Sequence, residues 1–270
     1  MDKIQIIYAR NKRERVIFKI IIPVLTVITF LILWEVLVYY GIIPSRYLPR
    51  PSELARTFIV KLSDPNPEGA TLLLNIISSL KISITGFFLA LLIGIPLGLL
   101  MGWYKAVDRF VKPLFEMIRP IPPIAWIPLT ILLLGIGFRA KVFIIFFSAF
   151  VPCVINSYTG IKLTNPTLIN VAKTCGASNF QLFLKVGIPS SVQMIFAGIK
   201  VALGASWSTL VAAEMLASNS GLGFMILMGR LFARPDLILL GMIIIGVIGA
   251  LMLVILSKFE SKLARWRSIK

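Results

Sequence analysis

Histidine is absent from the 270-residue sequence, and cysteine occurs only at Cys153 and Cys175. The two cysteines form no Cys-x-x-Cys pair, so we predict no zinc site, no disulfide framework and no histidine-based catalysis. The hydrophobic runs contain no paired carboxylates for acid–base chemistry, and the chain lacks the G-x-x-x-x-G-K-[ST] loop that cradles the phosphates of ATP. We therefore expect a protein that is not an enzyme, with no metal site and no cofactor of its own.

Acidic residues are also scarce, because 11 Asp and Glu stand against 28 Lys and Arg, a net charge of +17. Such an excess is typical of nucleic-acid binding, but here the basic residues lie beside long hydrophobic runs. Hydrophobic residues make up 58% of the chain, and the mean hydropathy is +0.92. This composition predicts a protein embedded in the lipid bilayer, whose cations set topology and contact anionic lipid, with no nucleic-acid partner.

Several hydrophobic runs are long enough to span a membrane, which takes roughly 20 mostly apolar residues in a helix. They lie near residues 17–40, 82–104, 120–138, 142–160, 190–216 and 237–257. We therefore predict an all-α polytopic membrane protein with about six transmembrane helices.

Lys and Arg divide unevenly between the two sides that six spans create. The N-terminal tail, the second-to-third loop, the fourth-to-fifth loop and the C-terminal tail carry 18 of them, and the opposite loops carry nine. Because cytoplasmic loops are enriched in basic residues, both termini are predicted to be cytoplasmic. Residues 1–19 then form a basic cytoplasmic N-terminal tail, and residues 20–270 form a single transmembrane domain.

Small residues and prolines mark the second and third spans. Small side chains recur every four residues in the second span, at Gly86, Ala90, Gly94, Gly98 and Gly102, a pattern that lets another helix approach closely. Prolines at 120, 122, 123 and 128 remove backbone donors, so the third span is expected to be kinked or broken. A broken helix at membrane depth is compatible with a translocation path, and equally with packing alone.

Polar side chains within the spans are candidates for such a path, because charge in lipid is costly and usually faces a cavity or a partner. Glu214 either lines a pore or anchors the outer end of the fifth span, whereas Glu35 is expected at the outer interface. The candidates for the translocation path are Trp126, Asn156, Ser206, Trp207, Thr209 and Glu214.

The fourth-to-fifth loop, residues 162–189, has the features of a capped helical hairpin. Asn165 and Pro166 form a helix start, Gly176 fits a left-handed C-terminal cap, and Ser178 with Gln181 forms a capping box for a second short helix. Apolar residues at 168, 171, 172 and 175 follow the spacing of helix-in-groove docking, and the pattern continues at 180, 183 and 184. The loop is predicted to dock onto a cytoplasmic partner, or alternatively to lie on the membrane surface.

This spacing resembles the cytoplasmic signature of binding-protein-dependent ABC importer permeases, E-A-A-x3-G-x9-I-x-L-P. Asn170, Val171 and Ala172 stand at the E-A-A positions, Gly176 at the glycine, and Pro189 at the proline, so that Asn170 and Val171 depart from the usual Glu and Ala. Four further stretches resemble the nitrate, sulfonate and taurine subgroup of this family: YLPRPSEL (47–54), RPIPPIAWIPL (119–129), LVAAEML (210–216) and SGLGFMI (220–226).

The resemblance implies a type I ABC importer permease fold with a core at about residues 75–260 and cytoplasmic coupling helices at 162–189. It also implies four kinds of partner: a cytoplasmic ATPase dimer that binds the ATP and Mg, a second permease chain, an extracellular or periplasmic solute-binding protein, and the lipid bilayer. The residues expected to couple to the ATPase are Leu168, Asn170, Val171, Ala172, Gly176, Ala177, Phe180, Phe183 and Pro189.

The implied function is import of a small solute across a bacterial cytoplasmic (inner) membrane, with a sulfonate- or taurine-like, nitrate-like or related organic anion as the solute. The alternative is a secondary transporter or channel with no ATPase partner, driven by an ion gradient. That alternative predicts transport by this chain alone and a row of intramembrane carboxylates or paired charges, of which the sequence offers little besides Glu214.

Overall fold

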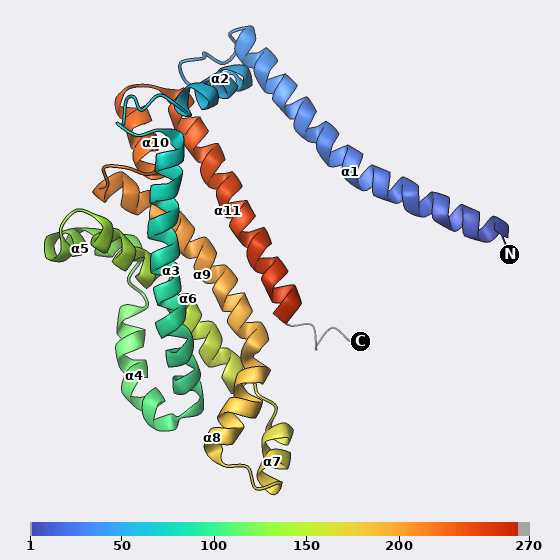
Figure 1. Ribbon diagram of the computed structural model, residues 1–270, viewed down its shortest axis with the longest axis vertical. Helices are drawn as coiled ribbons and strands as arrows, with labels where there is room; N and C mark the ends of the chain where they lie inside the picture. The colour runs from blue at the N-terminus through green and yellow to red at the C-terminus, as the bar shows by residue number, and fades with distance from the viewer. Residues whose placement is uncertain (1, 264–270) are drawn as a thin grey trace.

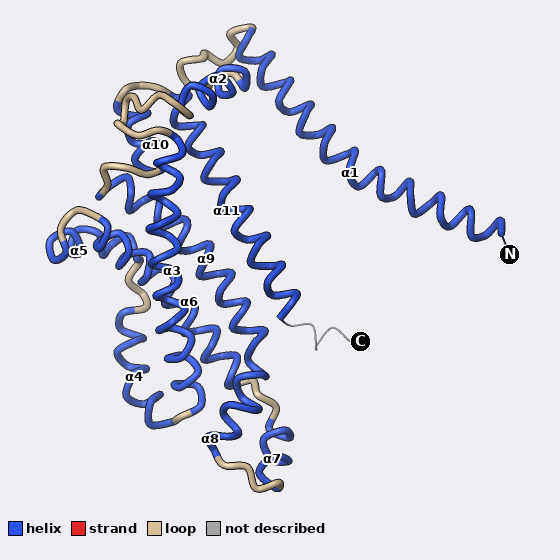
Figure 2. Tube along the Cα trace, viewed as in Figure 1, coloured by secondary structure: helices blue, strands red, loops and turns tan. Residues whose placement is uncertain are grey.

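The computed structural model describes residues 2–263, and that part of the chain is helical with short connecting loops and without strands (Figure 2). The elements in chain order are α1 (Asp2–Tyr39), α2 (Pro51–Lys61), α3 (Leu72–Trp103), α4 (Lys105–Ile118), a 3-10 turn (Pro123–Trp126), α5 (Ile127–Leu134), α6 (Phe138–Lys162), α7 (Pro166–Thr174), α8 (Asn179–Leu182), a π-helical turn (Phe183–Gly187), α9 (Ile188–Ala217), α10 (Leu222–Leu231) and α11 (Pro235–Leu263). The predicted all-α class is confirmed.

Within the described residues, five helices are long and apolar enough to cross a membrane. These spans are Ile21–Tyr39, Leu72–Trp103, Phe138–Lys162, Asn179–Leu216 and Pro235–Lys262. A sixth span results if α4 and the segment Pro123–Leu134 are taken together, although they meet at an angle of 84°. The prediction of about six spans agrees with this count.

The third expected span, at 120–138, differs from a straight helix. α4 ends at Ile118, and the next helical residue is Pro123, so the break falls on Pro120 and Pro122. Three prolines within four positions cannot donate to an α-helical ladder, which explains why the chain turns here. The basic stretch expected as a loop, residues 105–119, is instead the helix α4, so the broken span begins near the end of α3.

The centre of the fold is the packing of α3 against α6, with α9 beside them (Figure 1). The predicted small-residue ridge of α3 makes this contact: a Cβ at Gly86 would lie 2.9 Å from the carbonyl oxygen of Val142, and one at Gly98 would overlap the carbonyl oxygen of Val154. The helix backbones thus approach more closely than larger side chains would permit. The adjoining core is apolar and includes Ala90, Ala149 and Ala202, none of which is accessible to solvent.

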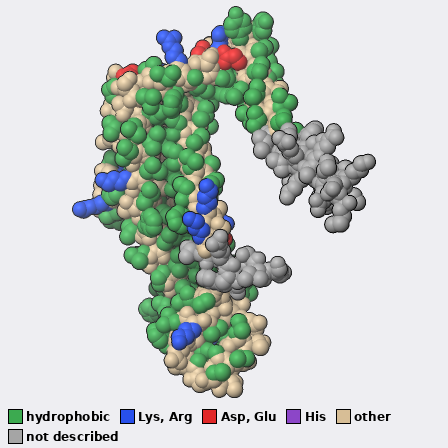
Figure 3. Space-filling model, turned by 45° about the vertical axis from the view of Figure 1, so that its right-hand side comes forward, with side chains coloured by type: hydrophobic (Ala, Val, Ile, Leu, Met, Phe, Trp, Pro, Cys, Tyr) green, Lys and Arg blue, Asp and Glu red, His purple; other side chains and the backbone are tan. Residues whose placement is uncertain are grey.

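α1 leaves the bundle at one end and extends away from it (Figure 1), with 6% of its apolar segment buried. Its contact with α2 includes the expected interface residue Glu35, whose Oε1 accepts a hydrogen bond of 2.7 Å from the Ser52 hydroxyl. Hydrophobic side chains cover most of the long helices (Figure 3), as lipid requires. The expected tail at 1–19 and the basic residues at 265, 267 and 270 have side chains outside the described part.

The two ends of the bundle differ in structure. α2 and α10 lie at the end where α1 joins the bundle, and α7 and α8 lie at the opposite end (Figure 1). α3 and α9 run nearly the whole distance between them, so these two helices connect the ends of the molecule.

We predict that Gly98→Ala lowers stability by about 1–3 kcal/mol, because the added methyl group meets backbone rather than a movable side chain. Gly204→Ala is the matched control, since a Cβ there has open space around it. Thermal unfolding of the two variants in detergent measures the difference. Equal midpoints would show that the α3–α6 approach is not the tight contact described here.

Candidate functional site

The helical hairpin between α6 and α9 has the caps expected from the sequence. The Asn165 side chain accepts a 2.8 Å hydrogen bond from the Thr167 amide, and the Ser178 hydroxyl accepts one of 3.3 Å from the Gln181 amide. Gln181 returns a bond, because its side-chain oxygen accepts from the Ser178 amide at 2.9 Å. Gly176 has φ of +80°, the left-handed conformation that favours glycine. These predictions of local structure are confirmed.

The outer surface of the hairpin is apolar and uncovered. Leu168, Val171 and Phe180 are exposed by 52%, 59% and 62%, which is unusual for side chains of this kind in a polar connecting segment. The other residues that are expected to couple to the ATPase differ in their exposure. Asn170, Gly176 and Pro189 are exposed, Ala172 and Ala177 are half-buried, and Phe183 is buried.

Phe183 belongs to the attachment of the hairpin rather than to its outer surface. Its ring lies 5.8 Å from that of Trp103 and 5.7 Å from that of Tyr104, at the end of α3. The Trp103 indole N–H also donates a 3.2 Å hydrogen bond to the side-chain oxygen of Asn179 in α8. The π-helical turn then joins α8 to α9 without a loop. The hairpin is therefore tied to both long helices that cross the molecule.

At the opposite end, Glu214 of α9 is completely buried. Its carboxylate accepts hydrogen bonds from the Ser79 hydroxyl, at 2.7 and 3.0 Å, and from the Gly223 amide at 2.8 Å. Ser79 lies on α3, and Gly223 lies in the first turn of α10, where backbone N–H groups lack helical partners. One carboxylate thus joins three helices.

The start of α10 is bound to α3 by two further hydrogen bonds. The Gly221 amide donates to the Asn75 side-chain oxygen, and the Leu222 amide donates to the Ser79 hydroxyl, each at 2.9 Å. Gly221 has φ of +119°, and a Cβ there would overlap the Glu214 carboxylate. The stretches LVAAEML and SGLGFMI, which the sequence presents separately, therefore form one buried unit, which we call the Glu214 cluster: Asn75, Ser79, Glu214, Gly221 and Gly223.

Charged groups lie next to this cluster on both sides. Lys141 of α6 is buried and donates a 2.8 Å hydrogen bond to the Ser218 hydroxyl, just beyond the end of α9. Glu68, before α3, accepts a 3.1 Å bond from the Asn75 amide group and forms a buried ion pair of 2.8 Å with Lys61. Buried charges are stable only with such partners.

The other candidates for a translocation path are dispersed. Trp126 is half-buried and packs against Phe147 with 5.2 Å between ring centroids, and the Asn156 amide group donates to the Pro152 carbonyl oxygen at 2.8 Å. The buried Ser206 hydroxyl bonds within its own helix, to the Leu203 carbonyl oxygen at 2.9 Å. The Trp207 indole N–H donates to the Ile245 carbonyl oxygen at 3.0 Å. Thr209 lies 2.8 Å from the Ser148 hydroxyl. The six candidates therefore stay individual predictions rather than one assembled site.

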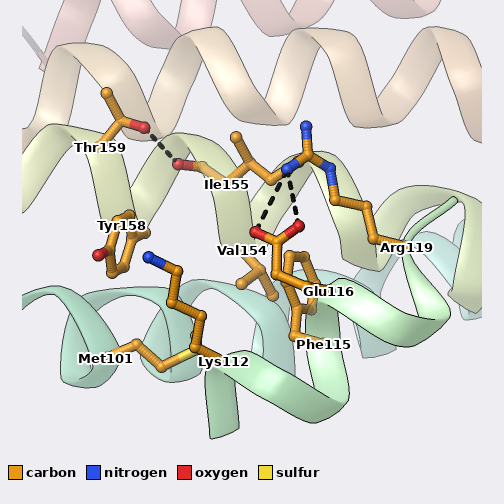
Figure 4. A pocket seen from close by; sticks show the side chains of 9 residues that line it. All are labelled: Met101, Lys112, Phe115, Glu116, Arg119, Val154, Ile155, Tyr158 and Thr159. Atoms are coloured by element: carbon orange, nitrogen blue, oxygen red, sulfur yellow. Dashed lines mark hydrogen bonds and ion pairs between the residues drawn. The ribbon is translucent and has the colours of Figure 1, made fainter. Parts of the chain in front are cut away.

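Two features escaped the reasoning from sequence. Asn75 and Ser79 lie 11 and 7 residues before Gly86, about three and two helical turns, so they share the face of the α3 ridge and this spacing was available as a signal. Four charged residues in α4 and at its C-terminal cap also share a face, at the spacing i, i+4, i+8 and i+11: Asp108, Lys112, Glu116 and Arg119. Their side of α4 lines a cavity against α6 (Figure 4). Among the described residues, no group of three or more Cys, Asp and Glu side chains has the arrangement of a metal site.

We predict that Glu214→Ala destabilises the protein by about 3 kcal/mol or more, because it leaves the Gly223 amide and the Ser79 hydroxyl without an acceptor and Lys141 without a nearby opposite charge. Glu53→Ala is the control, since Glu53 is a half-exposed carboxylate that caps α2 and is expected to contribute about 1 kcal/mol or less. Thermal unfolding and limited proteolysis at α10 report the effect. Wild-type behaviour of the Glu214 variant would contradict the structural role of the cluster.

Comparison with known proteins identifies the family to which this chain is similar. Residues 94–266 match the model of the binding-protein-dependent transport system inner membrane component. A protein described as an ABC transporter permease in Methanocaldococcus jannaschii is 40% identical over 260 residues, covering 96% of this chain and 95% of the relative.

Two bacterial relatives carry names that specify a solute. The taurine transport system permease protein of Escherichia coli is 32% identical over 241 residues, covering 89% of this chain and 88% of the relative. The nitrate import permease protein of Synechocystis is 32% identical over 238 residues, covering 87% and 86%. With most of its length matched in each comparison, this chain belongs to the family of binding-protein-dependent transport system inner membrane components, the permease subunits of ABC transporters.

Proposed function

We propose that this chain is the membrane subunit of an ATP-driven importer, and that it transmits motion from a cytoplasmic ATPase through the α7–α8 hairpin to the opposite end of the bundle. The observation that carries the proposal is the exposed apolar surface of Leu168, Val171 and Phe180 on a hairpin that is capped at each short helix. A surface of this kind fits a groove in a partner protein.

The attachment of the hairpin supports its use as a lever. A push on the hairpin reaches α3 through Trp103 and Asn179, and reaches α9 through the π-helical turn. The same two helices hold α10 at the far end, through Ser79 on α3 and Glu214 on α9. A relative shift of α3 and α9 at one end must therefore displace groups at the other, because packed helices move as rigid bodies rather than deform.

The proposed partners are those with which the family works, placed on this arrangement. The ATPase supplies the ATP and Mg sites, an external solute-binding protein delivers the solute to the end that holds α2 and α10, and a second copy of this chain completes the path. With the hairpin in the cytoplasm and the bent α4–α5 pair counted as one span, both termini lie in the cytoplasm. The protein then resides in the cytoplasmic membrane, with its basic segments on the inner face.

A small organic anion is the favoured solute. The support comes from the relatives named for taurine and nitrate, both of which are anionic or carry an anionic group. It also comes from the cations Lys112 and Arg119, which face a cavity between α4 and α6 (Figure 4).

Transport assays on the permease with its ATPase and binding protein in proteoliposomes test the coupling. We predict that Val171→Asp weakens ATPase binding by about tenfold or more, because burying an unpaired carboxylate in an apolar groove costs well over 1.4 kcal/mol. Transport should fall with it, while membrane insertion stays normal. Lys173→Gln, at an exposed position of the hairpin outside the docking stripe, should leave both unchanged.

Gly176→Pro tests the rigidity of the hairpin separately. Proline cannot adopt the φ of +80° found at Gly176 and removes the amide that donates to the Lys173 carbonyl oxygen, so the end of α7 must rearrange. We expect ATP hydrolysis to continue with little transport. Normal transport by this variant, or transport by the chain without any ATPase, would contradict the proposal; the second result would favour a secondary transporter.

A further inference from the structure

α4 is amphipathic, and its charged face rather than its apolar face is directed at the rest of the bundle. Its apolar face is open, with Phe110, Leu114 and Met117 exposed by 76%, 56% and 73%. Its charged face, which carries Lys112, Glu116 and Arg119, points towards α6 (Figure 4). A helix that only shielded charge from lipid at a membrane surface would turn this face to water rather than to a second helix of the bundle. Charged side chains that border a cavity inside a transport protein are candidates for a solute or ion pathway.

The space between the two helices is a cavity of about 200 Å³. One wall is apolar and rigid, because Met101 of α3 and Val154 of α6 are buried to 2% and 1% exposure. The other wall carries Lys112, Glu116 and Arg119. The lining also includes Phe115 of α4 and Ile155, Tyr158 and Thr159 of α6. Ligand sites for drug-sized molecules occupy roughly 300–1,000 Å³, so this cavity suits a smaller solute with one charged end and one apolar end.

The charges around the cavity favour an anion. Arg119 and Glu116 form an ion pair of 3.4 Å, with side chains about half exposed. Lys112 forms no ion pair with any described residue, and its ammonium group lies 5.8 Å from the centre of the Tyr158 ring. Two charged groups outside the lining also contact Tyr158: Asp108 accepts a 3.4 Å bond from the Tyr158 hydroxyl, and the Lys162 ammonium group lies 5.4 Å from the centre of the same ring. In the lining itself, the two cations Lys112 and Arg119 thus stand against one carboxylate, Glu116.

We propose that this cavity binds a small organic sulfonate, with the sulfonate group at Lys112 and Arg119 and the carbon chain against Met101 and Val154. The proposal rests on the proposed import function, because it makes the cavity a site that the solute occupies inside the permease during import. The apolar wall distinguishes a sulfonate with a carbon chain from nitrate, since nitrate has no methylene groups to bury there.

The cavity lies near the end of the bundle that holds the hairpin, which is the side where an imported solute is released. Tyr158 and Thr159 lie in the last turns of α6, which ends at Lys162 just before the hairpin. Arg119 is the residue that caps the end of α4, so its position changes if the angle between α4 and α5 changes. Movement of the hairpin and of the broken span therefore acts directly on the wall of the binding site.

Charge-selective labelling of a cysteine in the cavity tests the proposal. Thr159→Cys is made in full-length protein that also carries Cys175→Ser, which removes the exposed natural thiol. Membrane vesicles are treated with 2-sulfonatoethyl methanethiosulfonate or with its trimethylammonium analogue, each of which transfers its thioalkyl group to the cysteine thiolate and releases methanesulfinate. We expect the sulfonate reagent to react about tenfold faster, and sodium ethanesulfonate to slow it.

Lys112→Met should abolish the tenfold preference, whereas Lys105→Met, on the same helix but outside the lining, should preserve it. Ile155→Cys provides a second labelling position in the same cavity. Equal rates for the two reagents at both positions, a preference unaffected by Lys112→Met, or no protection by ethanesulfonate would overturn the proposal. Because labelling needs neither ATP nor a binding protein, such a result would leave the coupling function intact, and a loss of ATPase docking would leave the labelling intact.

Discussion

The close approach of α3 and α6 is the contact on which the other features depend. Because glycine at 86, 94, 98 and 102 lets the two backbones touch, these helices form a frame that cannot slide without steric overlap. Both functional ends are built on this frame. Ser79 of α3 and Lys141 of α6 border the buried Glu214, whereas Trp103 of α3 holds the hairpin that follows α6. The cavity between α4 and α6 uses the same frame, with Met101 and Val154 as its fixed wall.

A rigid frame beside a less firmly held broken span fits a transporter better than it fits a simple pore. The Glu214 cluster is fully hydrogen-bonded and buried, so α10 has one defined position in this state. The end of α5, in the broken α4–α5 pair, is not held by a buried cluster of this kind, because Leu132 and Leu133 are exposed by 80% and 71%. Motion is therefore easier at the broken span than at the frame, which is where a solute path requires it.

Local features of the sequence predicted local structure well. Caps at Asn165 and Ser178 and the left-handed Gly176 depend on neighbouring residues alone, and each was found where expected. Contacts between distant segments are harder to predict from sequence. Glu214 stands out as a carboxylate within a hydrophobic span, but its bonds to Ser79 and Gly223 join parts of the chain that no periodicity connects. The sequence predicts a loop at α4, so its charges are explained there by topology alone. The proline break moves the start of the broken span back by a whole helix, and this shift hides the face that the charges share. Phe183 fitted a docking stripe by spacing, yet it packs inward, because the π-helical turn changes the direction of the side chains that follow α8.

The central claim is that the ATPase binds the surface of the α7–α8 hairpin. The natural thiol of Cys175 on that hairpin allows this contact to be measured directly. Cys175 is exposed and Cys153 is buried, so a short thiol-reactive cross-linker reports on the hairpin alone. In membranes that contain the assembled complex, the account predicts a cross-linked permease–ATPase product that Cys175→Ser abolishes. An intact, ATP-hydrolysing complex in which Cys175 reacts freely and never cross-links to the ATPase would contradict it.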